Sequence, residues 1–220
     1  MTIRLHRGGR WRAWLGRRLG GDAALGDRAW RRCLHGAGTA VLLYYLLPGR
    51  FFLFVSTETV LVAALGSVLA LEALRLGAGL ELPTIRPYER RRLASYAYYA
   101  IALTVAVLLF PRPIAVAVVL GTALVDPLIG ELRPSARFAP LYPLVPVVVW
   151  AALAVTAFTL VGGWAPLPAT AAALGGGALA VAAERPRMAM VDDDLVMTLV
   201  PALALTALLF LVPGFPGLGG

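Results

Sequence analysis

The chain has 220 residues, of which 60 % are hydrophobic and only 15 % are charged, and its mean hydropathy is +0.79. Soluble domains contain about 45–50 % apolar and about 25 % charged residues, so this composition excludes disordered and collagen-like chains and argues against a soluble enzyme. The single cysteine, Cys33, excludes an internal disulfide and a site built from several thiolates. The remaining class is a multi-pass membrane protein.

All twenty basic residues are arginines, and with twelve acidic residues they give a net charge of +8. In a soluble protein this charge would suggest nucleic acid, but in a membrane protein it indicates cytoplasmic loops that face anionic lipid headgroups. We therefore expect anionic lipids, and no nucleic acid, among the partners.

Residues 1–32 form a basic N-terminal segment with nine arginines, which we place in the cytoplasm. Its large apolar residues recur at spacings of three and four, a pattern that predicts a short amphipathic helix on the membrane surface. A basic disordered tail is the alternative. The segment lacks the continuous apolar core of a cleavable signal peptide.

Seven apolar segments follow and predict a transmembrane catalytic bundle over residues 33–213, with 214–220 as a short outer tail. Most of them reach the roughly 20 residues that a helix needs to cross the hydrocarbon layer. We therefore predict an all-α, multi-pass transmembrane helix bundle of about seven spans. The segments are 33–48, 51–74, 93–110, 113–132, 141–162, 165–183 and 195–213.

The arginines also predict an orientation in the cell membrane. With the N-terminus in the cytoplasm, eighteen arginines fall on the cytoplasmic side, and only Arg50 and Arg112 fall outside. This is a strong positive-inside signal, and it favours an odd number of spans with the C-terminus outside.

Most acidic residues lie at the same cytoplasmic helix ends, although no insertion rule requires it, and only Glu58 lies near the outer half. We interpret Glu81 and Glu89 as solvated loop residues. Ionisable residues inside apolar runs are costly and tend to face a partner or a cavity, so they are the stronger candidates for a site.

Asp126 interrupts an apolar stretch and is followed at once by Pro127. Asp followed by Pro is typical of a helix start, so we expect the span to break there and a new helix to begin inside the membrane. Free N–H groups at such a break suit phosphate, and the carboxylate suits Mg²⁺. A capped kink without a ligand is the alternative.

Three consecutive aspartates, Asp192, Asp193 and Asp194, open the last apolar segment. Helix capping alone would favour acidic residues there, but the repulsion among three would be relieved by a divalent cation. Together with Asp126 they would hold one or two Mg²⁺ ions on a nucleoside triphosphate. Arg185 and Arg187, just upstream, are expected to pair with its phosphates.

Two further motifs carry polar residues at the same side. His35 follows a pair of arginines. It is a proton acceptor, a phosphate-binding group, or a residue of the membrane interface or the core without a chemical role. Glu72 and Arg75 share one helix face at a spacing of three, which also fits a local ion pair.

The order of these motifs resembles the CTP-dependent polyprenol kinase family, which includes dolichol kinase, phytol kinase and CTP-using diacylglycerol kinases and is related to phosphatidate cytidylyltransferases. The resemblance covers roughly residues 28–205. The chain departs from the family pattern at Val125, where glycine is usual, at Asp194, where asparagine is usual, and in 131–138, which lacks the usual Lys-Ser pair. The motifs are Arg31-Arg32-x-x-His35, Glu72-x-x-Arg75, Asp126-Pro127-x-x-Gly130, Ala183-Glu184 and Asp192-Asp193-Asp194-Leu195.

The resemblance implies Mg²⁺-dependent phosphoryl transfer from CTP to the hydroxyl of a membrane lipid alcohol at the cytoplasmic face. The acceptor would be a polyprenol, a phytol-like alcohol or diacylglycerol. Asp126 and Asp192–Asp194 would bind metal and nucleotide phosphates, and either Asp126 or His35 would act as the base. The remaining polar residues of the implied site are Arg32, Glu72, Arg75, Arg133, Arg137 and Glu184.

Two other functions remain open from the sequence. One is a cytidylyltransferase that makes a CDP-lipid and releases pyrophosphate. The other is a transporter or non-catalytic membrane protein, which would need polar residues in both halves of the membrane, where Glu58 is the one good outer candidate. The Ala- and Gly-rich stretch 169–183 would suit a homodimer interface.

Overall fold

The computed structural model describes residues 32–51, 55–80, 85, 89–184 and 191–211. In this part of the chain the fold is all-helical apart from one pair of two-residue strands. The predicted N-terminal helix, Arg185, Arg187 and the outer tail lie outside the described residues. The elements after the helical residues 32–38 are η1 (Thr39–Tyr45), β1 (Arg50–Phe51), β2 (Val55–Ser56), α3 (Thr57–Ala78), α4 (Ser95–Leu109), α5 (Arg112–Leu132), η3 (Ala139–Leu141), α6 (Leu144–Leu160), α7 (Pro166–Ala183) and α8 (Asp193–Leu211).

Each of the seven predicted apolar segments contains a helix, in the expected order. Within the described residues, four helices are long and apolar enough to cross a membrane: α3, α5, α7 and α8. The apolar helices α4 and α6 are shorter, with 15 and 17 residues. The all-helical character and the membrane-type helices are therefore confirmed, whereas the number of spans stays a prediction.

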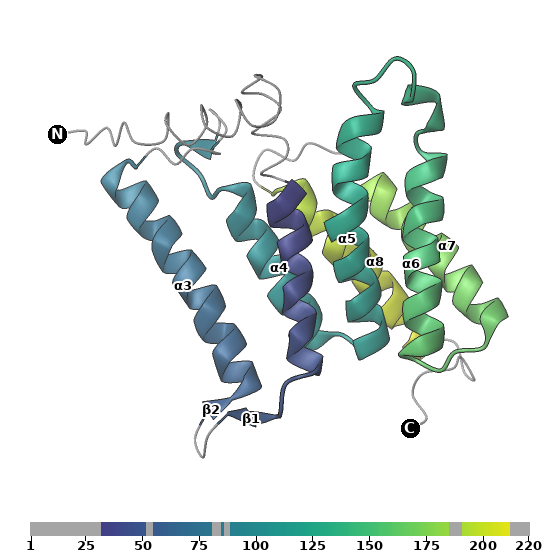
Figure 1. Cartoon of the computed structure of the whole chain (residues 1–220), viewed down its shortest axis with the longest axis horizontal. Helices are drawn as coiled ribbons and strands as arrows, with labels where there is room; N and C mark the ends of the chain where they lie inside the picture. The colour runs from purple at the N-terminus through teal and green to yellow at the C-terminus, as the bar shows by residue number, and fades with distance from the viewer. Residues whose placement is uncertain (1–31, 52–54, 81–84, 86–88, 185–190, 212–220) are drawn as a thin grey trace.

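Successive helices run in opposite directions, as Figure 1 shows, so their ends gather at two faces. The starts of α4, α6 and α8 and the ends of α3, α5 and α7 lie at the upper end in that view, and the strand pair lies at the lower end. Helix α8 packs against α4, α5 and α7, which places it inside the bundle. Residues from distant parts of the chain thereby meet at the upper end.

Local signals explain where several helices begin and end. Ser56 caps α3, because its Oγ accepts the backbone N–H of Thr59 at 3.1 Å. Gly79 ends the same helix with a φ of +62°, a conformation that glycine adopts without steric cost. Prolines stand in the first turns of α5 and α7. They are tolerated there because a backbone N–H in the first turn has no acceptor within the helix, so its absence costs no helical hydrogen bond.

The predicted helix break at Asp126 is wrong. Helix α5 continues from Arg112 to Leu132 with Pro127 inside it, and the hydrogen bond from Arg133 N to Ile129 O (3.1 Å) lies beyond the proline. Apolar helices that pack against neighbours tolerate an internal proline, and α5 packs against both α6 and α8. No new helix start is available for phosphate, so a site at Asp126 must rest on side chains.

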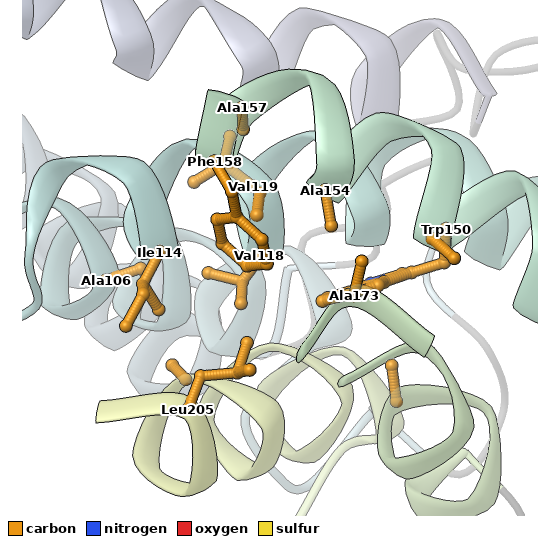
Figure 2. Packing of buried hydrophobic residues seen from close by; sticks show 14 of the residues in the cluster. Ala106, Ile114, Val118, Val119, Trp150, Ala154, Ala157, Phe158, Ala173 and Leu205 are labelled. Atoms are coloured by element: carbon orange, nitrogen blue, oxygen red, sulfur yellow. The ribbon is translucent and has the colours of Figure 1, made fainter. Parts of the chain in front are cut away.

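The apolar core lies among α4, α5, α6, α7 and α8 (Figure 2). Trp150 of α6 is fully buried, and a Cβ added at Gly121 of α5 or Gly176 of α7 would collide with its ring. Helix α3 lies at the edge of the bundle, and only 11 % of its apolar window is buried, compared with 56 % for α5. The helices that carry Asp126 and Asp194 therefore belong to the most closely packed part of the described chain.

Candidate functional site

Three residues predicted from separate motifs meet at the upper end of the bundle. His35 Nε2 lies 3.1 Å from Asp194 Oδ1 and 3.3 Å from Asp126 Oδ2. The imidazole comes from helical residues 32–38, and the two carboxylates come from α5 and α8. The fold thus brings together an acid pair and an imidazole that are far apart in the sequence.

A threonine pair one helical turn deeper aligns the two carboxylates. Thr122 precedes Asp126 by four residues and Thr198 follows Asp194 by four, on helices that run in opposite directions. Thr198 Oγ1 donates its one hydrogen to the carbonyl of Asp194 at 2.7 Å, so Thr122 must donate in the 2.8 Å contact between the two hydroxyls. This buried bond links α5 and α8 directly below the site.

Tyr99 of α4 holds His35 in place. The two rings stack with centroids 4.8 Å apart and an interplanar angle of 27°. The phenol of Tyr99 also donates to the backbone carbonyl of His35 at 2.8 Å. The imidazole is therefore oriented by contacts on its ring face and on its own backbone.

A second polar group joins the site through Ser95, at the start of α4. Ser95 Oγ lies 2.7 Å from Asp192 Oδ2 and 2.5 Å from Glu89 Oε1. Burial raises the pKa of Asp192 to about 6, and the neighbouring Asp193 adds to the rise. Asp192 therefore sits where a cation would relieve the cost of its charge.

Glu89 corrects an interpretation made from the sequence. It is 2 % exposed and is not a solvated loop residue. Besides the contact with Ser95 Oγ, its carboxylate accepts the backbone N–H of Ser95 at 3.2 Å. No charge or motif pattern marked Glu89 or Ser95, and the one available signal was the position of Ser95 directly before an apolar run.

The site residues line a cavity of about 80 Å³ with two kinds of wall. A water molecule needs about 10–15 Å³ of such space, so the cavity has room for an ion with a few waters. The polar wall consists of His35, Glu89, Ser95, Asp126, Asp193 and Asp194, and the less polar wall of Leu34, Ile85, Ala94, Tyr96 and Tyr99.

Glu72 and Arg75 are placed outside the cavity wall and form a buried ion pair. Arg75 Nε and Nη2 each donate to a Glu72 carboxylate oxygen at 2.7 Å. Arg75 Nη2 also donates to the carbonyls of Glu89 (3.1 Å) and Arg92 (2.7 Å), and the N–H of Ala94 donates to Glu72 at 2.7 Å. The ion pair therefore holds the backbone of residues 89–94, which leads into α4, in place.

Three of the predicted phosphate-binding arginines, Arg32, Arg133 and Arg137, contact carboxylates or aromatic rings and lie outside the cavity wall. Arg32 pairs with Glu131, and Arg133 Nη1 lies 2.5 Å from Glu184 Oε1. Arg133 also lies over the ring of Tyr142, at 4.9 Å, and Arg137 over that of Phe138, at 5.2 Å.

Two sets of residues are spaced to hold a metal ion. His35, Asp126 and Asp194 each offer one ligand atom within 4.8 Å of the others, and Asp192, Asp193 and Asp194 do the same. Among the described residues, the predicted catalytic and metal-binding groups therefore lie in one place, whereas Glu72, Arg75, Arg133 and Glu184 surround it.

Comparison of the chain with protein-family models, with curated proteins and with solved structures found no match. The functional argument therefore depends on the geometry of the site and on the motif pattern of the sequence.

Proposed function

We propose that the protein is a seven-span membrane enzyme that transfers the γ-phosphoryl group of CTP to the hydroxyl of a membrane lipid alcohol. Its N-terminus and site would face the cytoplasm, and its C-terminus would lie outside. The observation that carries the proposal is the meeting of Asp126, Asp194 and His35 in a cavity at one end of apolar helices. Phosphoryl transfer requires mainly charge neutralisation and positioning, which such a site supplies.

The two walls of the cavity support a lipid acceptor. A lipid alcohol presents a hydroxyl beside an apolar chain, and the cavity presents carboxylates beside Leu34, Ile85 and two tyrosines. The site lies at helix ends, where a headgroup would reach it from the bilayer and a nucleotide would reach it from water.

The carboxylates fit Mg²⁺, a hard ion that prefers oxygen ligands and phosphate co-ligands. Asp126 and Asp192–Asp194 would hold it, and when bound it would neutralise charge on the nucleotide phosphates. Either Asp126 or His35 would accept the proton of the attacking hydroxyl. The choice of CTP as donor comes from the sequence resemblance.

A radiolabel assay tests the proposal. Purified protein in lipid micelles is incubated with Mg²⁺, γ-labelled CTP or ATP, and a polyprenol, phytol or diacylglycerol, and the lipids are then extracted. We expect label from CTP in one of these lipids. Asp126→Asn should lower the rate by about 100-fold or more, the scale of a lost acid–base or charge-stabilising group.

Glu58→Gln is the matched control, because Glu58 lies at the other end of the bundle, hydrogen-bonded by Tyr44 at 3.1 Å. It should retain the wild-type rate. Pyrophosphate release with phosphatidate, without lipid label, would show a cytidylyltransferase instead. Absence of label in every lipid would refute the kinase, and full activity in a folded Asp126→Asn protein would remove Asp126 from the site.

A further inference from the structure

The three atoms at the centre of the site are spaced like ligands of a single ion. His35 Nε2 lies 3.1 Å from one carboxylate oxygen and 3.3 Å from the other. Two ligands that are each about 2.1 Å from an ion lie about 3.0 Å apart at a right angle and about 3.4 Å apart at a tetrahedral angle. Both measured separations fall in this interval, and the ligand atoms of all three residues lie within 4.8 Å of one another, so a small side-chain adjustment would let one ion contact all three.

Hydrogen bonding alone accounts for this arrangement less well. Nε2 of an imidazole carries at most one hydrogen, which can make one well-directed bond or a weaker one shared between the two oxygens. If that hydrogen points at Asp194, the oxygen of Asp126 faces the nitrogen without a proton between them, and the reverse also holds. A cation between the three atoms satisfies all of them at once.

The kind of donor atom indicates the kind of ion. Mg²⁺ keeps to oxygen ligands and loses its water reluctantly, whereas imidazole nitrogen binds first-row transition metals more readily. One nitrogen and two carboxylate oxygens therefore make a poor site for Mg²⁺ alone. They make a reasonable site for an ion such as Mn²⁺, Fe²⁺ or Zn²⁺.

The ligands are held in place by neighbours before any ion arrives. Tyr99 orients His35 through its ring and its hydroxyl, and the bond between Thr122 and Thr198 fixes α5 against α8. The side chain of Asp194 is 5 % exposed and that of Asp126 is 25 % exposed, and both line the cavity. Contacts that hold the ligand residues in place, like those of Tyr99, Thr122 and Thr198 here, raise the affinity of metal sites.

We propose that His35, Asp126 and Asp194 bind one first-row transition-metal ion in preference to Mg²⁺, with His35 Nε2 as a direct ligand. This ion would take the place of Mg²⁺ at Asp126 and Asp194 in the proposed function, on which the proposal rests for the role of the ion but not for its binding. A nitrogen that ligates an ion does not take up the proton of a hydroxyl. The base is then a carboxylate and not His35.

Mn²⁺ is the probe for the test, because its unpaired electrons report the nuclei bound to it. Full-length protein, purified without a polyhistidine tag, is loaded with one equivalent of Mn²⁺ in detergent and measured by pulsed electron paramagnetic resonance. We expect the ¹⁴N coupling of a directly bound imidazole. His35→Gln should abolish it, and His6→Gln should leave it intact, since the chain has two histidines.

A competition titration gives a second readout. In the wild type, Mg²⁺ should displace half of the Mn²⁺ only at about 10–100-fold higher concentration, the scale on which one contact changes metal affinity. In His35→Gln this ratio should approach one. Absence of Mn²⁺ binding, absence of ¹⁴N coupling in the wild type, or displacement at equal concentration would each overturn the proposal, whether or not His35→Gln folds.

The two proposals fail separately. Coupling without any labelled lipid would leave the metal site in place and refute the kinase. Labelled lipid without coupling would leave the kinase in place and remove His35 from the metal.

Discussion

Glu72 and Arg75 lie on one face of α3, only 1 % and 2 % exposed, and each satisfies the other's charge. A spacing of three residues placed the two on one face and left a local ion pair open as the alternative to a role in the site. It was not enough to predict that Arg75 would also bind the carbonyls of Glu89 and Arg92. The pair thus acts on the site through the backbone that leads into α4.

The first prediction concerns this ion pair. Arg75→Met should lower the free energy of unfolding by about 3–5 kcal/mol, because it leaves the buried charge of Glu72 without a partner. The double variant Glu72→Leu/Arg75→Met should lose less than Arg75→Met alone. Denaturant unfolding in detergent measures all three values, and a single variant as stable as the wild type would contradict the burial of the pair.

The sequence identified Asp126 because an ionisable residue in an apolar segment is costly and needs a reason. It identified Asp194 from the repulsion among three consecutive aspartates, and His35 from its place after two arginines. These arguments miss Glu89 and Ser95. Polar residues are ordinary in a loop and at a helix start, and their burial depends on how α3 docks against α4. Docking of this kind is a tertiary effect that no local pattern records.

At the scale of single elements, α5 shows where local reasoning fails. Asp126-Pro127 is a strong signal for a helix start, yet the helix continues through both residues. Packing of α5 against α6 and α8 favours a continuous helix, and it outweighs the one backbone hydrogen bond that proline removes. The apolar periodicity predicted the helix correctly, and the dipeptide predicted its boundary incorrectly.

The second prediction tests how closely these helices approach. Gly121→Ala should destabilise the protein by about 1–3 kcal/mol, because the new methyl group would overlap the buried ring of Trp150. Gly130→Ala is the matched control on the same helix, since no atom lies within 4 Å of the position of its Cβ. Thermal unfolding in detergent should separate the two variants, and equal melting temperatures would contradict the close contact.

At the scale of the whole molecule, the charged side chains of the described residues gather mainly at one end of the bundle. Arg32, Arg75 and Arg133 lie at the end that carries the site, whereas Arg50 and Arg112 lie at the other end (Figure 1). The apolar runs predicted the order of the helices, since hydrophobicity is a local property. The number of helices that cross the membrane was harder to predict. The helices α4 and α6, with 15 and 17 residues, are at or below the shortest length that spans a bilayer.

The third prediction tests the orientation with Cys33, the one cysteine of the chain, which is exposed at the end that carries the site. A membrane-impermeant maleimide should label it in inside-out vesicles and not in intact cells. Arg50→Cys in a Cys33→Ser background is the matched control and should show the reverse. Labelling of Cys33 in intact cells would place the site outside and contradict a cytoplasmic nucleotide donor.

Helix α3 has little protein around it, since only 11 % of its apolar window is buried. Its middle turns therefore have to meet a general requirement for hydrophobicity, whereas each residue of α5 has to fit particular neighbours. In a lineage of related chains, the middle of α3 would drift freely among Leu, Val, Ala and Ile while its last two turns, with Glu72 and Arg75, stayed fixed. The rate of substitution along this one helix would then show at which turn its surroundings change from lipid to protein.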